Sequence, residues 1–186
     1  MSPAAKTKPA EFADLWSEDR DLQNAAFTSV IASTDQPVAW AYDVWEEVVS
    51  NLTHVDNHNR AIAAQVLCNL AKSDPDRRIL GDFEGLLDVT RDHRFVTARH
   101  CLQSLWKIAV AGDDQLDVLL HGLQARFAEC GGEKNPTLIR HDIIKSLRDA
   151  YDTTGDMAFR EVAQTLIQTE DDPKYRTKYQ GLWKDV

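Results

Sequence analysis

The segment ARHCLQSLWKIA (Ala98–Ala109) decides the fold, because its pattern occurs three times in the chain. An arginine is followed by apolar residues three or four positions apart, as also in NRAIAAQVLCNLA (Asn59–Ala71) and IRHDIIKSLRDAY (Ile139–Tyr151). That spacing places the apolar side chains on one face of an α-helix. The arginines Arg60, Arg99 and Arg140 lie about 40 residues apart, the length of one helix-turn-helix repeat. The pattern predicts repeated helix pairs.

The rest of the chain shows the same helical spacing. Alternating strand patterns are absent, and breakers such as SDPDRR and CGGEKNP divide the sequence into segments of ordinary helix length. We therefore predict an all-α protein of antiparallel helix pairs. The expected helices span residues 11–16, 19–33, 37–52, 58–72, 76–90, 94–111, 114–130, 136–151, 156–169 and 173–184.

The segment LLDVTRDHRFVTARHCLQSLWKIA (Leu86–Ala109) resembles the turn and second helix of a HEAT repeat, a member of the armadillo-type α-solenoid superfamily. It has an aspartate near the turn, an arginine at the helix start and leucines toward the end. The resemblance covers residues 37–186. It implies a short right-handed α-α superhelix of about four to five helix pairs. One repeat domain is expected over residues 11–186, after a disordered Lys/Pro-rich tail at 1–10.

Composition narrows the function classes. The chain has 186 residues, 43% of them hydrophobic, and a net charge of -9. This charge argues against general binding to nucleic acid or anionic membranes. No apolar run approaches the roughly 20 residues that cross a bilayer, and the first residues lack a hydrophobic signal segment, so a cytoplasmic location is expected. The three cysteines are widely separated, which predicts reduced thiols.

A helical wheel of the segment from Phe95 to Ala109 separates its chemical groups. Cys101 falls on the predicted apolar face, whereas His100 points to the opposite side. The two residues therefore cannot form a nucleophile–base pair within the helix. We predict that Cys101 has a packing role. The predicted core face comprises Phe95, Ala98, Cys101, Leu102, Leu105, Ile108 and Ala109.

The exposed faces of the three arginine-headed helices are predicted to line the concave surface of the array. They carry polar and basic side chains with few acids, because most acidic residues fall in the other helices and in turns. This predicts a mildly basic groove that would suit an acidic peptide; the alternative is that these faces are only solvated. The candidates are Gln65, Asn69, Lys72, His100, Gln103, Ser104, Lys107, His141, Lys145 and Arg148, with Arg99 and Trp106 at the edge.

Catalytic and metal-binding motifs are not predicted. His54, Asp56 and His58 carry ligand-type groups, but they fall in a turn where Asp56 or Asn57 would cap a helix, and no third His or Cys is close in sequence. No cofactor is expected either. The leading hypothesis is a non-enzymatic scaffold or adaptor that binds a protein or an acidic peptide.

Two further hypotheses remain. The first alternative is a DNA-processing enzyme on the same fold, because HEAT-like repeats include alkylpurine glycosylases. The residues to test in that case are Asp142, Asp149, Trp106 and Tyr151. The second alternative is a helical oligomer whose surface serves self-association.

Overall fold

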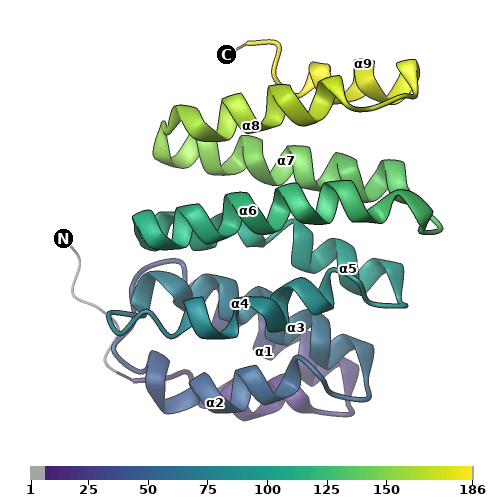
Figure 1. Cartoon of the computed structure of the whole chain (residues 1–186). Helices are drawn as coiled ribbons and strands as arrows, with labels where there is room; N and C mark the ends of the chain where they lie inside the picture. The colour runs from purple at the N-terminus through teal and green to yellow at the C-terminus, as the bar shows by residue number, and fades with distance from the viewer. Residues whose placement is uncertain (1–6, 186) are drawn as a thin grey trace. The chain divides into compact units, whose positions relative to one another are not determined.

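Every regular element within the described residues, 7–185, is helical, as predicted, and this part of the chain contains no strand (Figure 1). The computed structural model divides into two compact units, unit 1 up to Cys101 and unit 2 from Leu102. Each unit is described by itself. Of the predicted disordered tail, residues 1–6 lie outside the described residues, and Ala10 already begins a helix.

Unit 1 consists of successive helices joined by short turns. Its elements are η1 (Ala10–Trp16), α1 (Arg20–Ser33), α2 (Ala41–Asn51), α3 (Asn57–Leu70), η2 (Ala71–Ser73), α4 (Ile79–Val89) and α5 (Phe95–Leu102), which ends at the boundary. Aspartates begin two of them: Asp19 caps α1 and Asp56 caps α3, accepting hydrogen bonds from backbone N–H groups of the first turn. The predicted cap at Asp56 or Asn57 is thus Asp56.

Alternate helices of unit 1 lie side by side in two rows. Gln23 Nε2 of α1 donates to Asn59 Oδ1 of α3 at 2.9 Å, and Asn57 Nδ2 of α3 donates to Thr97 Oγ1 of α5 at 3.4 Å. Trp45 Nε1 of α2 donates to an oxygen of Asp82 of α4 at 2.8 Å. We call α1, α3 and α5 the inner row, and α2 and α4 the outer row.

Arginine–carboxylate pairs, here called rungs, join successive members of the inner row. Arg20 of α1 binds the α3 cap Asp56, and Arg60 of α3 binds Asp92 before α5, each with an N–O distance of 2.5 Å. Arg60 also donates to the backbone oxygens of His54 and Val55. Each rung therefore connects one helix with the turn that starts the next helix in its row.

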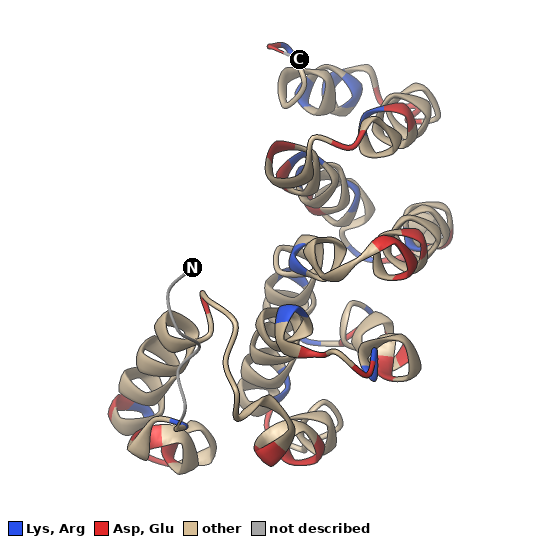
Figure 2. Cartoon of the chain, turned by 90° about the vertical axis from the view of Figure 1, so that its left-hand side faces the viewer, with Lys and Arg blue, Asp and Glu red and all other residues tan. Residues whose placement is uncertain are grey.

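Unit 2 repeats this arrangement. Its elements are η3 (Leu105–Ala111), α6 (Asp113–Glu129), η4 (Cys130–Gly132), α7 (Pro136–Thr154), α8 (Met157–Gln168) and α9 (Pro173–Gly181). In Figure 2, followed back from the C-terminus, α9 and α7 fall in one column and α8 and α6 in the other. With η3, α7 and α9 form the inner row of unit 2. A third rung joins Arg140 of α7 to Glu170 before α9, at 3.1 Å.

The predicted continuous helix over 94–111 is wrong. The α-helix α5 ends at Leu102, a turn follows at Gln103 and Ser104, and η3 continues as a 3-10 helix from Leu105. A 3-10 helix brings residues three apart onto one face, and Leu105 and Ile108 are both fully buried at that spacing. Apolar residues three or four apart fit either helix, so the sequence pattern did not reveal the break.

The predicted core of this region is otherwise correct. Cys101, Leu105 and Ile108 have no exposed surface, and Ala98 is 2% exposed. Phe95 is only half-buried.

No helix among the described residues is long and apolar enough to cross a membrane.

Candidate functional site

A pocket of about 260 Å³ opens on the inner row of unit 1, and we call it the inner-row pocket. All three helices of the row contribute side chains to it. α1 provides Gln23, Asn24 and Phe27; α3 provides Asn57, His58, Ala61, Ile62 and Gln65; α5 provides Val96, Thr97 and His100. Within each helix these positions are mostly three or four residues apart, so the pocket follows the helical faces rather than a loop.

The lining of the inner-row pocket is uncharged apart from two imidazoles. The described residues that line it include no Asp, Glu, Lys or Arg, although charged residues make up 27% of the chain. Four carboxamides, Gln23, Asn24, Asn57 and Gln65, lie beside the apolar side chains of Phe27, Ala61, Ile62 and Val96. Val96 is 63% exposed, whereas Ile62 is only 7% exposed. The lining thus combines apolar side chains with neutral hydrogen-bonding groups.

The carboxamides of the pocket differ in how far they are already used. Gln23 is buried, donates to Leu15 O and Asn59 Oδ1 and accepts from Arg20, so its group is committed to the fold. The Asn24 and His58 side chains make no hydrogen bond with the described part of the chain. Gln65 Nε2 donates only within its own helix, to Ala61 O at 3.0 Å. The rim therefore offers neutral donors and acceptors to another molecule.

The structure brings two of the predicted site residues of unit 1, Gln65 and His100, to this pocket. The prediction that Asn69 is exposed is wrong: Asn69 is 1% exposed and donates to Thr34 Oγ1 at 3.0 Å. The reason is that α3 packs against α1, α2 and α4 and is buried over most of its circumference. Lys72 is half-buried and donates to Asp35 O, and Arg99 is half-buried near the Phe95 ring.

The predicted residues of η3 and the turn before it are less accessible than expected. Ser104 is 7% exposed, so its predicted exposure is wrong, because the turn after α5 rotates it out of the helical phase. Gln103 is exposed and donates to Asp142 Oδ1 at 3.2 Å. Lys107 and Trp106 are half-buried, with the Lys107 ammonium 5.8 Å from the Trp106 ring centroid.

The predicted cations of α7 have acidic partners one turn later. Lys145 binds Asp149 at 2.5 Å, and Arg148 binds Asp152 at 2.7 Å. Arg148 also donates to Leu182 O at 2.7 Å. Pairing with these two acids therefore offsets the positive charge that was predicted for the α7 face. His141, also on α7, is half-buried with its ring 6.2 Å from that of Tyr179.

Three of the four residues named for the DNA-processing alternative, Asp142, Asp149 and Tyr151, make contacts within unit 2. Asp142 is 2% exposed and accepts from Gln103. Asp149 is bound by Lys145. The Tyr151 ring packs 5.7 Å from that of Trp183.

Sequence reasoning missed most of the inner-row pocket. Asn57 and His58 are predicted to lie in or beside a turn, and Phe27 lies in the predicted helix 19–33, outside the residues covered by the HEAT resemblance. Val96 could have indicated the pocket from the sequence. It is an apolar residue in the first turn of α5 that lies outside the predicted apolar face of the helix, and it is exposed.

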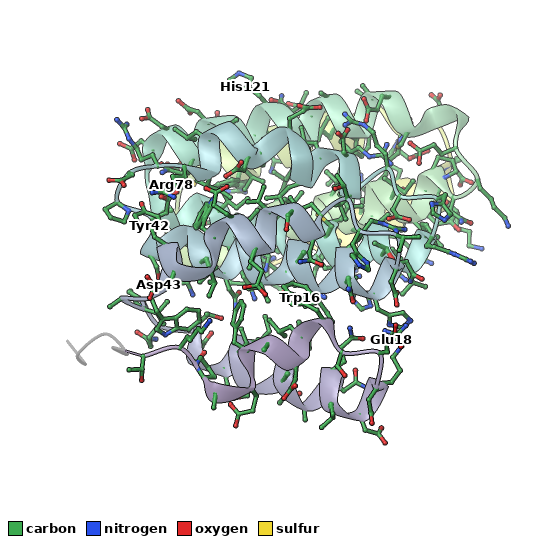
Figure 3. The ribbon with its side chains drawn as sticks, turned by 90° about the horizontal axis from the view of Figure 1, so that it is seen from below. Trp16, Glu18, Tyr42, Asp43, Arg78 and His121 are labelled. Carbon is green, nitrogen blue, oxygen red and sulfur yellow. The ribbon has the colours of Figure 1, made fainter. Side chains whose placement is uncertain are left out.

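A polar cluster fixes the turn before α4 in unit 1. Tyr42 OH donates to Asp74 Oδ1 at 2.6 Å and accepts from the backbone N–H of Asp76 at 2.8 Å. The Arg78 guanidinium lies over the Tyr42 ring, 4.1 Å from its centroid, and Figure 3 shows the two side chains together. Burial, together with the hydrogen bond to Asp74, raises the pKa of Tyr42. We assign this cluster to the structure of the turn, where Arg77 has a positive φ of 57°.

The cysteines are buried thiols. Burial raises the pKa of Cys101 well above its ordinary value, with a further contribution from Cys68, and burial also raises the pKa of Cys130. Raised pKa values disfavour the reactive thiolate. No group of three or more His, Cys, Asp or Glu residues in the described part of the chain is placed to hold a metal ion.

Comparisons with known proteins give a fold likeness. No family model matches the chain, and no curated protein matches it. A crystal structure of an engineered protein, a target of the Northeast Structural Genomics Consortium, is similar with a TM-score of 0.55 and 17% identity. The match covers 94% of this chain and 76% of that one. At this identity the likeness concerns the fold alone.

Proposed function

We propose that the chain is a non-enzymatic helical-repeat scaffold that binds a protein or peptide on the inner row of its helix pairs. The observation that carries the proposal is the inner-row pocket, where three successive helices of one row present side chains to the same opening. Repeat proteins bury their core by stacking, and their row surfaces stay available for partners.

The repeat arrangement supports a HEAT-like superhelix as the finer fold. In each unit the helices alternate between two rows, and a rung links one inner helix to the start of the next. The rungs join residues 36, 32 and 30 positions apart. Each rung therefore spans one helix pair, from an inner helix to the start of the next inner helix.

The pocket supports binding rather than a purely solvated face. Its lining contains both apolar side chains and polar groups with unused hydrogen-bonding capacity. Specific sites in proteins combine the same two features. The volume of about 260 Å³ is slightly smaller than usual for a small-molecule site, which favours part of a polypeptide as the occupant.

Panning a displayed peptide library on the full chain tests this proposal. We expect enriched peptides that slow amide exchange in α1, α3 and α5 and that lose binding in Val96→Asp. The matched control is Val55→Asp, because Val55 is 92% exposed in the same unit and lies outside the pocket. Failure to enrich any peptide, or protection confined to other helices, would overturn the proposal.

A further inference from the structure

We infer that the inner-row pocket binds an extended, uncharged peptide segment and accommodates one apolar side chain of that segment. The inference rests on the proposed function and names its ligand class. It departs from the acidic peptide expected from the sequence, because the lining of the pocket differs from the face that the sequence predicted.

The first argument is charge. At the average composition of the chain, roughly three of the eleven lining residues would be charged, yet none is Asp, Glu, Lys or Arg. A charged side chain entering the pocket would lose hydration, which is costly, and apart from the imidazoles of His58 and His100 it would meet no ionisable side chain in the lining. The two rungs of unit 1, Arg20 with Asp56 and Arg60 with Asp92, are already paired. The lining therefore offers no carboxylate to a basic residue and no lysine or arginine to an acidic residue.

The second argument is the group of apolar side chains in the lining. Phe27 is half-buried, Ala61 and Ile62 are 8% and 7% exposed, and Val96 stands 63% exposed beside them. An aliphatic side chain placed here would cover Val96 and complete the contacts of Phe27. Because apolar burial scales with the area removed from water, a leucine is favoured over an alanine at this position.

The third argument is length and hydrogen bonding. The pocket follows α3 from Asn57 to Gln65, which is about 12 Å at the rise of an α-helix. An extended chain covers that distance with about four residues. Asn24, His58 and Gln65 line the pocket with unused hydrogen-bonding capacity, and neutral carboxamides match the N–H and C=O groups of a peptide backbone.

The probes are four peptides, acetyl-Ser-Ser-X-Ser-Ser-amide with X as Leu, Ala, Glu or Lys, titrated into the labelled full chain and followed by NMR. We expect X = Leu to shift signals of α1, α3 and α5 and to bind about tenfold more tightly than X = Ala. Glu and Lys should bind no better than Ala. Tighter binding by the Glu or Lys peptide would overturn this inference while leaving the proposed function intact.

A charge variant adds a second test, which compares the preference between peptides rather than the strength of binding. Val96→Asp places an acid in the first turn of α5, where a carboxylate is tolerated at a helix start, so the fold should persist. We expect the preference to change from Leu to Lys, with Val55→Asp leaving it unchanged and the melting curve as a check on folding. An unchanged preference in Val96→Asp would overturn the inference. If neither the four peptides nor any panned peptide binds, the proposed function itself fails.

Discussion

The inner rows of the two units use the same helix-pair pattern but present different surfaces. In unit 1, carboxamides, imidazoles and apolar side chains line a pocket, and the side chains of Asn24 and His58 make no hydrogen bond with the described part of the chain. On α7 of unit 2, Lys145 and Arg148 are each paired with an acid four residues later. A repeated architecture therefore does not predict a repeated surface, since residues one helical turn apart decide whether a polar group remains available.

The largest change in the free energy of unfolding is expected from substitutions in the close-packed core, which both units have. Leu67 in unit 1 and Leu147 in unit 2 have no exposed surface. Replacing either by alanine should lower the free energy of unfolding by about 2–5 kcal/mol, because it leaves a cavity. Urea unfolding measures this, with the half-exposed Leu22→Ala as control. A near-neutral result in one unit alone would show that its core is less well packed.

A smaller effect concerns the rung at Asp92 in unit 1. Burial raises the pKa of this carboxyl, but hydrogen bonds from Arg60 and from the backbone N–H of Arg94 outweigh it, so the net pKa is lowered. The pKa of Asp92 is therefore lower in the folded chain than in the unfolded chain, where it is about 4. The stabilisation of the fold by ionised Asp92 is complete above pH 4 and is lost as the pH falls through the pKa of Asp92 in the folded chain. Asp92→Asn should cost about 1.5–3 kcal/mol at pH 7.

The same variant should also weaken the dependence of stability on pH below about 4. Urea unfolding from pH 7 to pH 2.5 measures both effects. The exposed Asp88→Asn serves as control, because its pair with Arg91 lies at the surface. If Asp92→Asn kept both the stability and the acid sensitivity of the parent chain, the rung would have no energetic role.

The smallest expected effect concerns the paired charges of unit 2. The Lys145 side chain is 45% exposed and its partner Asp149 lies on the same helix. Such pairs contribute about 0.3–0.5 kcal/mol, so Lys145→Ala should change the unfolding free energy by no more than that. Thermal melting at low and high salt is the measurement. A loss above about 1 kcal/mol would mean that this pair is more than a surface contact.

Much of the fold followed from the apolar spacing. The segments predicted at 58–72, 136–151 and 156–169 correspond to α3, α7 and α8 with shifts of a few residues at their ends. The break after Leu102 did not follow, because Leu105 and Ile108 satisfy a 3-10 helix as well as an α-helix. The spacing of apolar residues on one face of each helix was enough to predict the helices. The change from α-helix to 3-10 helix after Leu102 depends on tertiary packing, which this spacing does not encode.

The candidate site was less predictable. His100 is exposed, as predicted, whereas Gln65 is half-buried. Asn69 was assigned to the same side, but a helix packed against three neighbours has no single solvent face. Phe27 and Val96 join the pocket from helices that are distant in sequence, and a wheel drawn for one helix contains no information about which residues of another helix it meets.

The rungs have a consequence for how such a chain can change in length. Asp56 caps α3 and also binds Arg20 of the preceding inner helix, so the start of one helix pair depends on the pair before it. Duplicating a whole pair would reproduce both halves of a rung at the new junction. Duplicating part of a pair would leave an arginine or a carboxylate without its counterpart. Gain and loss of length in this protein should therefore proceed by whole pairs.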